Sequence, residues 1–354
     1  MDRLLPSSVL TARASALLLG ALALAPRADA QDAARSLTEL PTLGGSATAY
    51  GINQAGTVFG ESRDGRISRD IRDERASWKA FIARPGEPLR ALESFAGLDA
   101  MRMNGRDVIV GQRFGSNSQR YAAFRWTASE GTVNLPAPPG ARYGTPVDID
   151  DAGNVLMNAN GNGFVLRAAT EDYVTLACLA AYTCSAVAMN EAGAIVGVAH
   201  PSIAGDAPGV PVYWSAASAP PVVLPRPADG EAEPRDLNDR GTIVGVAVTA
   251  SGSQVLAWRG DAHTLITLGA GSAHALNGRD VAAGDCPGHE EGPQTLPCLW
   301  DLQRGTETVL PPLNPQDSRV TLSGINDAGV AVGTAYDADG NGHPVVYRGY
   351  APAP

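Results

Sequence analysis

The sharpest chemical motif in this sequence is Asp337-Ala338-Asp339-Gly340-Asn341-Gly342. Calcium takes oxygen ligands, and three oxygen-bearing side chains at alternate positions before a turn Gly are typical of the first half of a calcium loop. The second half is missing, because Arg348 stands where such a loop carries its bidentate Glu, and no helix is expected on either side. Two interpretations stay open: a calcium site formed by Asp337, Asp339 and Asn341, or a polar turn between two strands.

Acidic residues could also carry acid–base chemistry. A pair of carboxylates ~5–10 Å apart can hydrolyse a glycosidic bond, and the candidates are Asp148, Asp150, Asp236 and Asp239. Asp150, however, occupies the position of a repeated Asn described below, which favours a role in a turn. Nucleophile motifs are absent: no Ser has Gly at both flanking second positions, and Pro293 stands where a zinc-protease helix needs its second His. We therefore predict no catalytic residues and keep a carbohydrate-active enzyme, a glycosidase or lyase, as the alternative.

The four Cys residues fall into two close pairs, Cys178 with Cys184 and Cys286 with Cys298. The sequence has no Cys-x-x-Cys, and its five His residues do not cluster at ligand spacing, which disfavours a zinc site. Close pairs are typical of local disulfides in a chain that enters an oxidising compartment, which the N-terminal signal described below predicts. We predict one disulfide within each pair.

Residues 63–75 place an Arg at every third position with acidic residues between them. The guanidinium group presents a planar fork of donors, so Arg66, Arg69 and Arg72 could hold an anionic or carbohydrate ligand. A solvated loop of mixed charge is the alternative interpretation.

These candidates are embedded in a short repeat, an Asn followed seven positions later by a Gly. The copies are Asn53/Gly60, Asn104/Gly111, Asn190/Gly197, Asn238/Gly245, Asn277/Gly284 and Asn326/Gly333, with a degenerate copy at Asp150/Met157. Repeats at ~40–50 residue spacing are typical of propellers, solenoids or arrays. Because the Asn shortly precedes a turn, we predict that it bonds the turn backbone rather than lining a channel with amides.

Each repeat predicts four β-strands. The Asn and Gly lie in a first hairpin, and a second hairpin joins an aromatic run such as Val212-Tyr213-Trp214 to a short run that ends in Leu. The last repeat lacks its fourth strand, and residues 37–40 end in a Leu-Pro step like the other fourth strands. Pairing this N-terminal strand with the last blade would close a ring and remove an open sheet edge.

We therefore predict an all-β fold, a seven-bladed β-propeller whose last blade is completed by residues 37–40. A single domain would span residues 31–350, with a tail at 351–354. The repeats would cover residues 41–92, 93–135, 136–176, 177–224, 225–268, 269–310, and 311–350 with 37–40. The links between second and third strands and between blades would gather on one face, which we expect to bind the ligand.

The repeat resembles the bacterial extracellular HAF repeat family. The resemblance lies in Tyr50-Gly51-Ile52-Asn53-Gln54-Ala55-Gly56-Thr57-Val58-Phe59-Gly60, in the Leu43-Gly44-Gly45 ahead of it and in the downstream Ala80-Phe81, and it extends over about residues 37–350. The His of the family's name is absent, since Lys79 and Ala122 precede the Ala-Phe steps. The resemblance implies an exported repeat protein and carries over no catalytic residue and no ligand.

The first thirty residues read as an export signal. Arg3 and Arg13 precede an apolar run at 16–25, and Ala28-Asp29-Ala30 fits a cleavage site before Gln31. The apolar run is too short to span a membrane, and no later segment approaches the ~20 apolar residues needed. We expect a secreted or periplasmic protein.

The net charge of the chain limits the classes of partner that we expect it to bind. The first thirty residues hold three basic and two acidic side chains, so the rest has 24 basic against 35 acidic residues, a net charge of −11. Such a surface repels nucleic acid and anionic lipid. We expect a monomeric binding scaffold for an unknown protein or glycan, with calcium as the one cofactor suggested and a purely structural surface protein as a further alternative.

Overall fold

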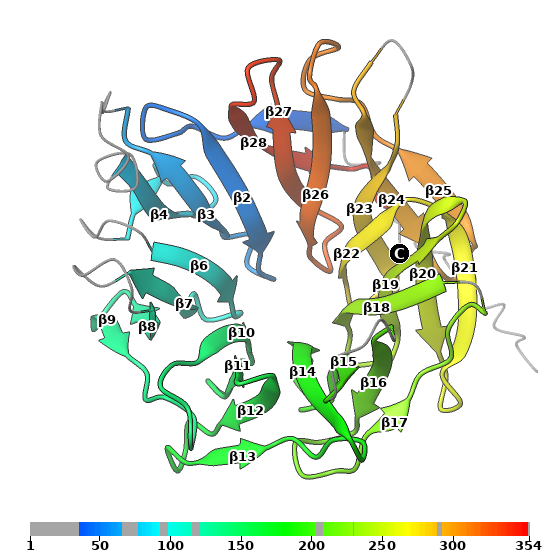
Figure 1. The fold of residues 1–354 in the computed structure, drawn as a ribbon. Helices are drawn as coiled ribbons and strands as arrows, with labels where there is room; N and C mark the ends of the chain where they lie inside the picture. Colours follow the sequence, from blue (N-terminus) through cyan, green and yellow to red (C-terminus); the bar gives the residue numbers. More distant parts are fainter. Residues whose placement is uncertain are drawn as a thin grey trace, which may run out of the picture. The chain divides into compact units, whose positions relative to one another are not determined.

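Seven antiparallel sheets of four strands each make up the described part of the chain. The computed structural model describes residues 35–65, 77–92, 98–114, 121–202, 208–228, 230–288 and 292–352. The sheets follow one another around a ring as the blades of a propeller (Figure 1). The predicted seven-bladed β-propeller is confirmed.

Within each blade the chain runs from the inside of the ring to the outside, with one exception in the last blade. The inner strands are β2 (Ala47–Ile52), β6 (Leu98–Met103), β10 (Thr145–Ile149), β14 (Tyr182–Met189), β18 (Gly230–Leu237), β22 (Ser272–Leu276) and β26 (Arg319–Ile325). The second strands are β3 (Val58–Arg63), β7 (Ile109–Phe114), β11 (Val155–Ala159), β15 (Ile195–Pro201), β19 (Ile243–Thr249), β23 (Val281–Pro287) and β27 (Ala331–Tyr336). The third strands are β4 (Trp78–Ala83), β8 (Tyr121–Thr127), β12 (Asn162–Leu166), β16 (Val210–Trp214), β20 (Gly252–Arg259), β24 (Thr295–Asp301) and β28 (Gly342–Arg348). The outer strands are β5 (Arg90–Ala91), β9 (Gly131–Asn134), β13 (Tyr173–Thr175), β17 (Val222–Val223), β21 (Thr264–Ala270), β25 (Thr306–Val309) and β1 (Ser36–Glu39). Within the described ranges, no helix is long and apolar enough to cross a membrane.

The ring is closed by β1, which pairs antiparallel with β28 and so becomes the outer strand of the last blade. Leu40 N donates to Pro344 O at 2.8 Å. The Leu at the end of each outer run makes the same bond in other blades, for example Leu224 N to Pro211 O at 2.9 Å. The Leu-Pro step therefore marks the same structural position at both ends of the chain, and the predicted closure by residues 37–40 is confirmed.

Every inner strand carries a β-bulge three residues before the repeat position of Asn. The bulged residues are Tyr50, Met101, Val147, Val187, Arg235, His274 and Ser323. A bulge adds one residue and bends the strand. A Cβ atom at Gly284, opposite the bulge, would lie 1.9 Å from Ser272 O, which no real side chain tolerates. This close approach explains why Gly ends the repeat, although Met157 stands there in the third blade.

The core lies between neighbouring blades rather than within one sheet. Val196, Leu224 and Trp258, from blades four and five, belong to one buried cluster. In blades five and seven a buried third-strand aromatic also bonds the link from the blade before it: Trp258 Nε1 donates to Pro225 O at 2.7 Å, and Tyr347 Oη donates to Pro311 O at 2.8 Å. Inner strands are thus held rigidly around the ring, which is the condition for a precise site on its axis.

Candidate functional site

The repeated Asn residues link one blade to the next at the tips of the inner hairpins. Each Asn accepts a main-chain N–H four positions on through Oδ1, as Asn238 does from Thr242 N at 3.1 Å. Each Nδ2 also donates to the main-chain carbonyl of the equivalent residue in the following blade: Asn53 to Asn104, Asn104 to Asp150, Asn190 to Asn238, Asn238 to Asn277, Asn277 to Asn326 and Asn326 to Asn53. The step from Asp150 to Asn190 differs, because an ionised carboxylate has no hydrogen to donate. Asp150 instead accepts both amides of Asn154, each at 2.7 Å.

A second set of inter-blade bonds surrounds this end of the ring, which we call the turn face. Main-chain N–H groups of one blade donate to side-chain oxygens of the next, at Asp151, Glu191, Asp239, Asp327 and Gln54. Partial burial raises the pKa of Glu191 to about 7, with the nearby carboxylates as a further cause. The turn face is therefore acidic, and its acids already brace the ring.

The space enclosed by the inner strands, here called the central channel, holds two adjoining cavities of about 360 and 740 Å³. The smaller is lined by inner-strand residues and by the turns that follow the Asn positions, such as Gln54 and Asp327. The larger is lined by Arg319 and Thr295, the first residues of β26 and β24, so it lies toward the opposite end, the loop face. Tyr50, Arg102, His274 and Ser323 border both cavities. The two cavities therefore adjoin along the channel and are lined mainly by inner strands.

Asp148 and Asp236, two of the four predicted acids, lie together in the smaller cavity beside Arg102. Their depth in the ring raises the pKa of both carboxyl groups, and the Asp148 charge helps to raise the pKa of Asp236 to about 7, while Arg102 opposes the rise at each. Each carboxylate bridges to the next blade: Asp148 accepts Met189 N at 2.8 Å, and Asp236 accepts Leu276 N at 2.7 Å. Both residues therefore brace neighbouring blades, and Asp236 changes its protonation state near neutral pH.

The other two predicted acids have different hydrogen-bond partners. The carboxylate of Asp150 is occupied by Asn154, as described above. Asp239 lines the same cavity at its turn-face end, where it accepts Ala192 N at 3.3 Å. Asp148 and Asp236 are therefore the candidate pair for acid–base chemistry, because they line one cavity and the charge of Asp148 acts on Asp236.

The loop-face cavity is basic, because three Arg side chains line it against one carboxylate, Asp285: Arg102, Arg235 and Arg319. Arg319 lies over the Tyr336 ring, 4.1 Å from its centroid, and Arg235 pairs with Glu233 at 2.7 Å. These contacts hold two of the guanidinium groups in place. Charge therefore reverses along the channel, from acidic at the turn face to basic at the loop face.

An imidazole lies at the junction of the two cavities. His274 Nε2 is 2.6 Å from Asp285 Oδ1, so the ring orientation is fixed by that carboxylate. Sequence reasoning did not single out His274, nor Arg102, Arg235 or Arg319. Arg235 and His274 occupy the bulge position, and a comparison of that position across the repeats would have been the signal to find them.

The predicted calcium residues form a closed turn between β27 and β28. Asp337 Oδ1 accepts Asp339 N at 2.9 Å and Asn341 N at 2.8 Å, and Oδ2 accepts Asn341 Nδ2 at 3.0 Å. The Asn341 amide is the first cause of a lowered Asp337 pKa. Calcium binding by Asp337, Asp339 and Asn341 stays a prediction, which a calcium titration of chelator-treated protein, followed by melting temperature, would test.

Both predicted disulfides are present. Cys178–Cys184 and Cys286–Cys298 have Cα–Cα distances of 5.5 and 5.8 Å. Three of these residues lie in strands near the loop face rather than in the loops themselves, since Cys184 is in β14, Cys286 in β23 and Cys298 in β24. The disulfides still connect segments at that end of the ring.

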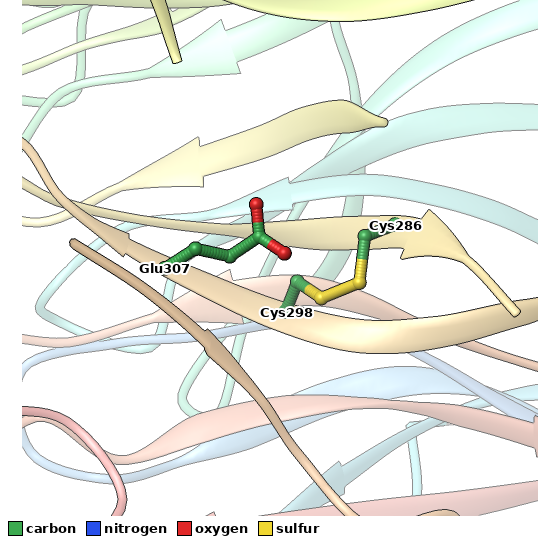
Figure 2. Close-up of side chains that lie close together, drawn as sticks. All are labelled: Cys286, Cys298 and Glu307. Atoms are coloured by element: carbon green, nitrogen blue, oxygen red, sulfur yellow. A yellow bond between two sulfur atoms is a disulfide. The ribbon is translucent and has the colours of Figure 1, made fainter. Parts of the chain in front are cut away.

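Figure 2 shows the Glu307 carboxylate beside the Cys286–Cys298 disulfide. Ligand atoms of these three residues lie within 4.8 Å of one another. The sulfur atoms are bonded to each other, and Glu307 Oε2 accepts Trp300 Nε1 at 3.0 Å. When the disulfide is formed, both sulfur atoms and one Glu307 carboxylate oxygen are therefore already bonded within the protein.

Arg66, Arg69 and Arg72, the predicted ligand-binding residues of the first blade, lie outside the described residues. So does the predicted export signal at 1–30. The segment 66–76 connects β3 to β4, so in sequence order it belongs to a link between second and third strands.

Comparison with known proteins supports the fold and leaves the family open. No protein-family model matches the chain, and no curated protein matches it in sequence. Among solved structures, the β-propeller domain of the Trilobed protease from Pyrococcus furiosus, with an open velcro topology, is similar at a TM-score of 0.57 and 11% identity, covering 85% of this chain and 93% of that one. Virginiamycin B lyase from Staphylococcus aureus gives 0.55 and 8%, covering 88% and 99%. YCF48 bound to D1 peptide gives 0.52 and 12%, covering 89% and 96%. At these identities the likeness establishes the propeller fold alone.

Proposed function

We propose that this chain is an exported binding scaffold that takes an acidic glycan into the loop-face end of its central channel. The observation that carries the proposal is the cavity of about 740 Å³ lined by Arg102, Arg235 and Arg319. Ligand cavities are typically ~300–1,000 Å³, with a few placed polar groups that orient the ligand. A guanidinium group binds carboxylate or sulfate through two parallel hydrogen bonds.

The chemistry of the cavity favours a sugar with acidic groups over a neutral one. Tyr50 and His274 add ring surfaces and polar atoms beside the three cations. The chain is strongly acidic as a whole, so a local basic cavity selects anions against the average field of the protein. Export by residues 1–30 and membership of the HAF repeat family are part of the proposal, and the two disulfides are in keeping with an oxidising compartment.

The proposal is tested by calorimetry and thermal melts of the chain from residue 31 with uronic acid oligosaccharides and their neutral counterparts. A ligand that binds only the folded state raises its stability, so the acidic sugars should raise the melting temperature. R235Q with R319Q should weaken that binding about tenfold or more, which corresponds to about 1.4 kcal/mol. R167Q is the matched control, because Arg167 is exposed on the turn between β12 and β13, where it pairs with Asp172.

Equal binding of neutral and acidic sugars by the wild type would contradict the proposal, and so would binding of the acidic sugars by the double variant as tight as that of the wild type. A lack of any sugar binding, together with capture of a purified acidic protein that R235Q and R319Q abolish, would replace the glycan with a protein partner at the same cavity.

A carbohydrate-active enzyme is the second candidate, and the Asp148 and Asp236 pair favours it. The pKa of Asp236, raised to about 7, would let it donate a proton near neutral pH. Product analysis on the same oligosaccharides tests this directly. If the chain cleaves a sugar, D236N should abolish cleavage while leaving binding intact, and wild-type activity should fall above about pH 7 as Asp236 ionises.

A further inference from the structure

A separate pocket of about 200 Å³ lies at the turn face, where turns of blades five and six meet. Arg240 lines it from the turn between β18 and β19, Arg279 from the turn between β22 and β23, and Arg304 from the turn between β24 and β25. This pocket shares no lining residue with the two channel cavities. It has no part in the function proposed above.

The first carboxylate near the pocket, Asp301, accepts hydrogen bonds from groups of its own turn. Oδ1 accepts Gln303 N at 2.9 Å and Arg304 N at 3.0 Å, and Oδ2 accepts Arg304 Nη1 at 2.7 Å. Its side chain is 4% exposed. Asp301 can therefore neutralise Arg304 and has little capacity left for another cation.

The second carboxylate, Asp280, bonds and pairs with side chains of blade five. Its Oδ1 accepts Asn238 Nδ2 at 2.8 Å, and its Oδ2 lies 3.5 Å from Arg259 Nη2 and 3.7 Å from Arg240 Nη1. Two guanidinium groups thus share one carboxylate. The side chain of Asp280 is 5% exposed, so water does little of the neutralisation.

Arg279 is left without a counter-charge. Among the described residues, no carboxylate lies within ion-pairing distance of it, and its Nε is buried without a hydrogen-bond partner. Its guanidinium group also lies against the neighbouring turn of blade seven, since Nη2 is 3.0 Å from the position of a Cβ atom at Gly329. A buried hydrogen-bond donor without an acceptor is rare in folded proteins, so an acceptor is expected beside Arg279 Nε.

Among the residues that the structure describes, four guanidinium groups therefore meet two carboxylates around a small pocket, in a protein whose net charge is −10. We propose that this pocket binds a small oxyanion, a phosphate, sulfate or free carboxylate group, held by Arg279 together with Arg240 and Arg304. An oxyanion offers several acceptors in the fork geometry that guanidinium groups recognise. It would supply both the missing charge and the missing acceptor for Arg279 Nε.

The test is isothermal titration of the chain from residue 31, in a buffer free of oxyanions, with sodium phosphate, sodium sulfate and sodium acetate. Sodium chloride at equal ionic strength is the control. We expect saturable binding of at least one oxyanion and none of chloride, with R279Q weakening the affinity at least tenfold. R279K, which keeps the charge but loses Nε and the fork, should fall between R279Q and the wild type.

Matched variants separate this site from the channel and from general charge effects. R142Q removes an exposed Arg that stacks on Tyr143, and R319Q removes a channel cation, so neither should change oxyanion affinity. Heats that match chloride for all three oxyanions would overturn the proposal, as would an R279Q variant that melts like the wild type and binds equally well. Loss of oxyanion binding in R279Q with sugar binding retained would leave the proposed function standing on its own.

Discussion

At positions 107 and 280 an Asp takes the left-handed backbone conformation, with φ of 59° and 62°. Gly takes that conformation at the equivalent place in the other blades, at Gly56, Gly153, Gly193, Gly241 and Gly329. The left-handed region is unfavourable for residues with a Cβ atom. Both carboxylates receive the Asn amide of the preceding blade at 2.8 Å, from Asn53 and Asn238, and both pair with Arg. Inter-blade bonding offsets local backbone strain at these two turns.

This difference between blades predicts unequal effects of one substitution. N190D removes the donor to Asn238 O and should cost about 1–2 kcal/mol of unfolding free energy. N238D also removes a donor, and in addition sets a second carboxylate against buried Asp280, so it should cost about 3–5 kcal/mol. Urea unfolding of the two variants measures the difference. Equal losses would show that the Asp280 contact does not contribute.

The raised pKa of Asp236 predicts that the stability of the protein depends on pH. Its folded pKa of about 7 exceeds its ordinary value of 3.8, so its contribution is fully present below about pH 4 and is lost as pH rises through 7. The loss is on the order of a few kcal/mol. Wild-type protein should therefore melt at lower temperature at pH 8 than at pH 5.5, and D236N should flatten that dependence. E231Q, an exposed substitution on the same strand, should melt with the wild-type profile at both pH values.

At the scale of the element, β1 decides the stability of the last blade. Leu37 packs against the core cluster of blades six and seven, and Leu40 against that of blades seven and one. Deletion of residues 36–40 should therefore lower the unfolding free energy by about 3–6 kcal/mol, through lost ladder bonds and lost apolar burial. A thermal melt of the chain from residue 31, with and without these residues, measures it. Identical melts would mean that β1 does not hold the ring closed.

His343, on β28, also holds β1 in place, through a contact with a carboxylate on that strand. Its Nδ1 lies 2.8 Å from Glu39 Oε1 on β1, and its Nε2 lies 3.5 Å from Asp337 Oδ2. The Glu39 hydrogen bond is the main cause of a raised His343 pKa. The resulting stabilisation is fully present below the ordinary His pKa of about 6.5 and is lost as pH rises through the raised value.

E39Q should therefore destabilise the protein at pH 5.5 and have little effect at pH 9. The expected loss is modest, below about 1 kcal/mol, because both groups are partly exposed. Melts of E39Q and of the exposed control E87Q at the two pH values test it. An equal loss for E39Q at both would assign the effect to something other than His343.

At the scale of the molecule, the outer strands are the exposed sheet edges of the ring. Val222, Val223 and Val309 on these edges are half exposed or nearly so. The strands are short, however, with two residues in β17 and four in β25, and Pro follows their ends at Pro225 and Pro311. Short edges next to Pro resist pairing with another sheet.

We therefore expect the chain from residue 31 to be monomeric, helped by mutual repulsion at a net charge of −11. Light scattering at low and physiological salt should give the mass of one chain in both. A dimer whose mass is lost on V222K with V223K would instead identify β17 as an association edge.

The sequence by itself determined the blade. Its repeat of Asn and Gly indicates a hairpin, the aromatic run and the Leu run indicate two further strands, and the Leu-Pro step at residues 40 and 41 indicates closure, because each signal depends on local turn and strand chemistry. The disulfide pairing could also be predicted from the sequence, because each of the four Cys residues has one other Cys close to it along the chain.

Only the tertiary structure decided the site. Asp148 and Asp236 are far apart in sequence and meet because equivalent positions of separate inner strands converge on one axis. The bulge shifts the alternation of each inner strand by one residue, so simple counting along the strand does not tell which side chain faces the channel. Arg235 and His274 line the channel through that shift. Arg279 has no carboxylate partner among the described residues, because the nearby Asp280 and Asp301 pair with other Arg side chains.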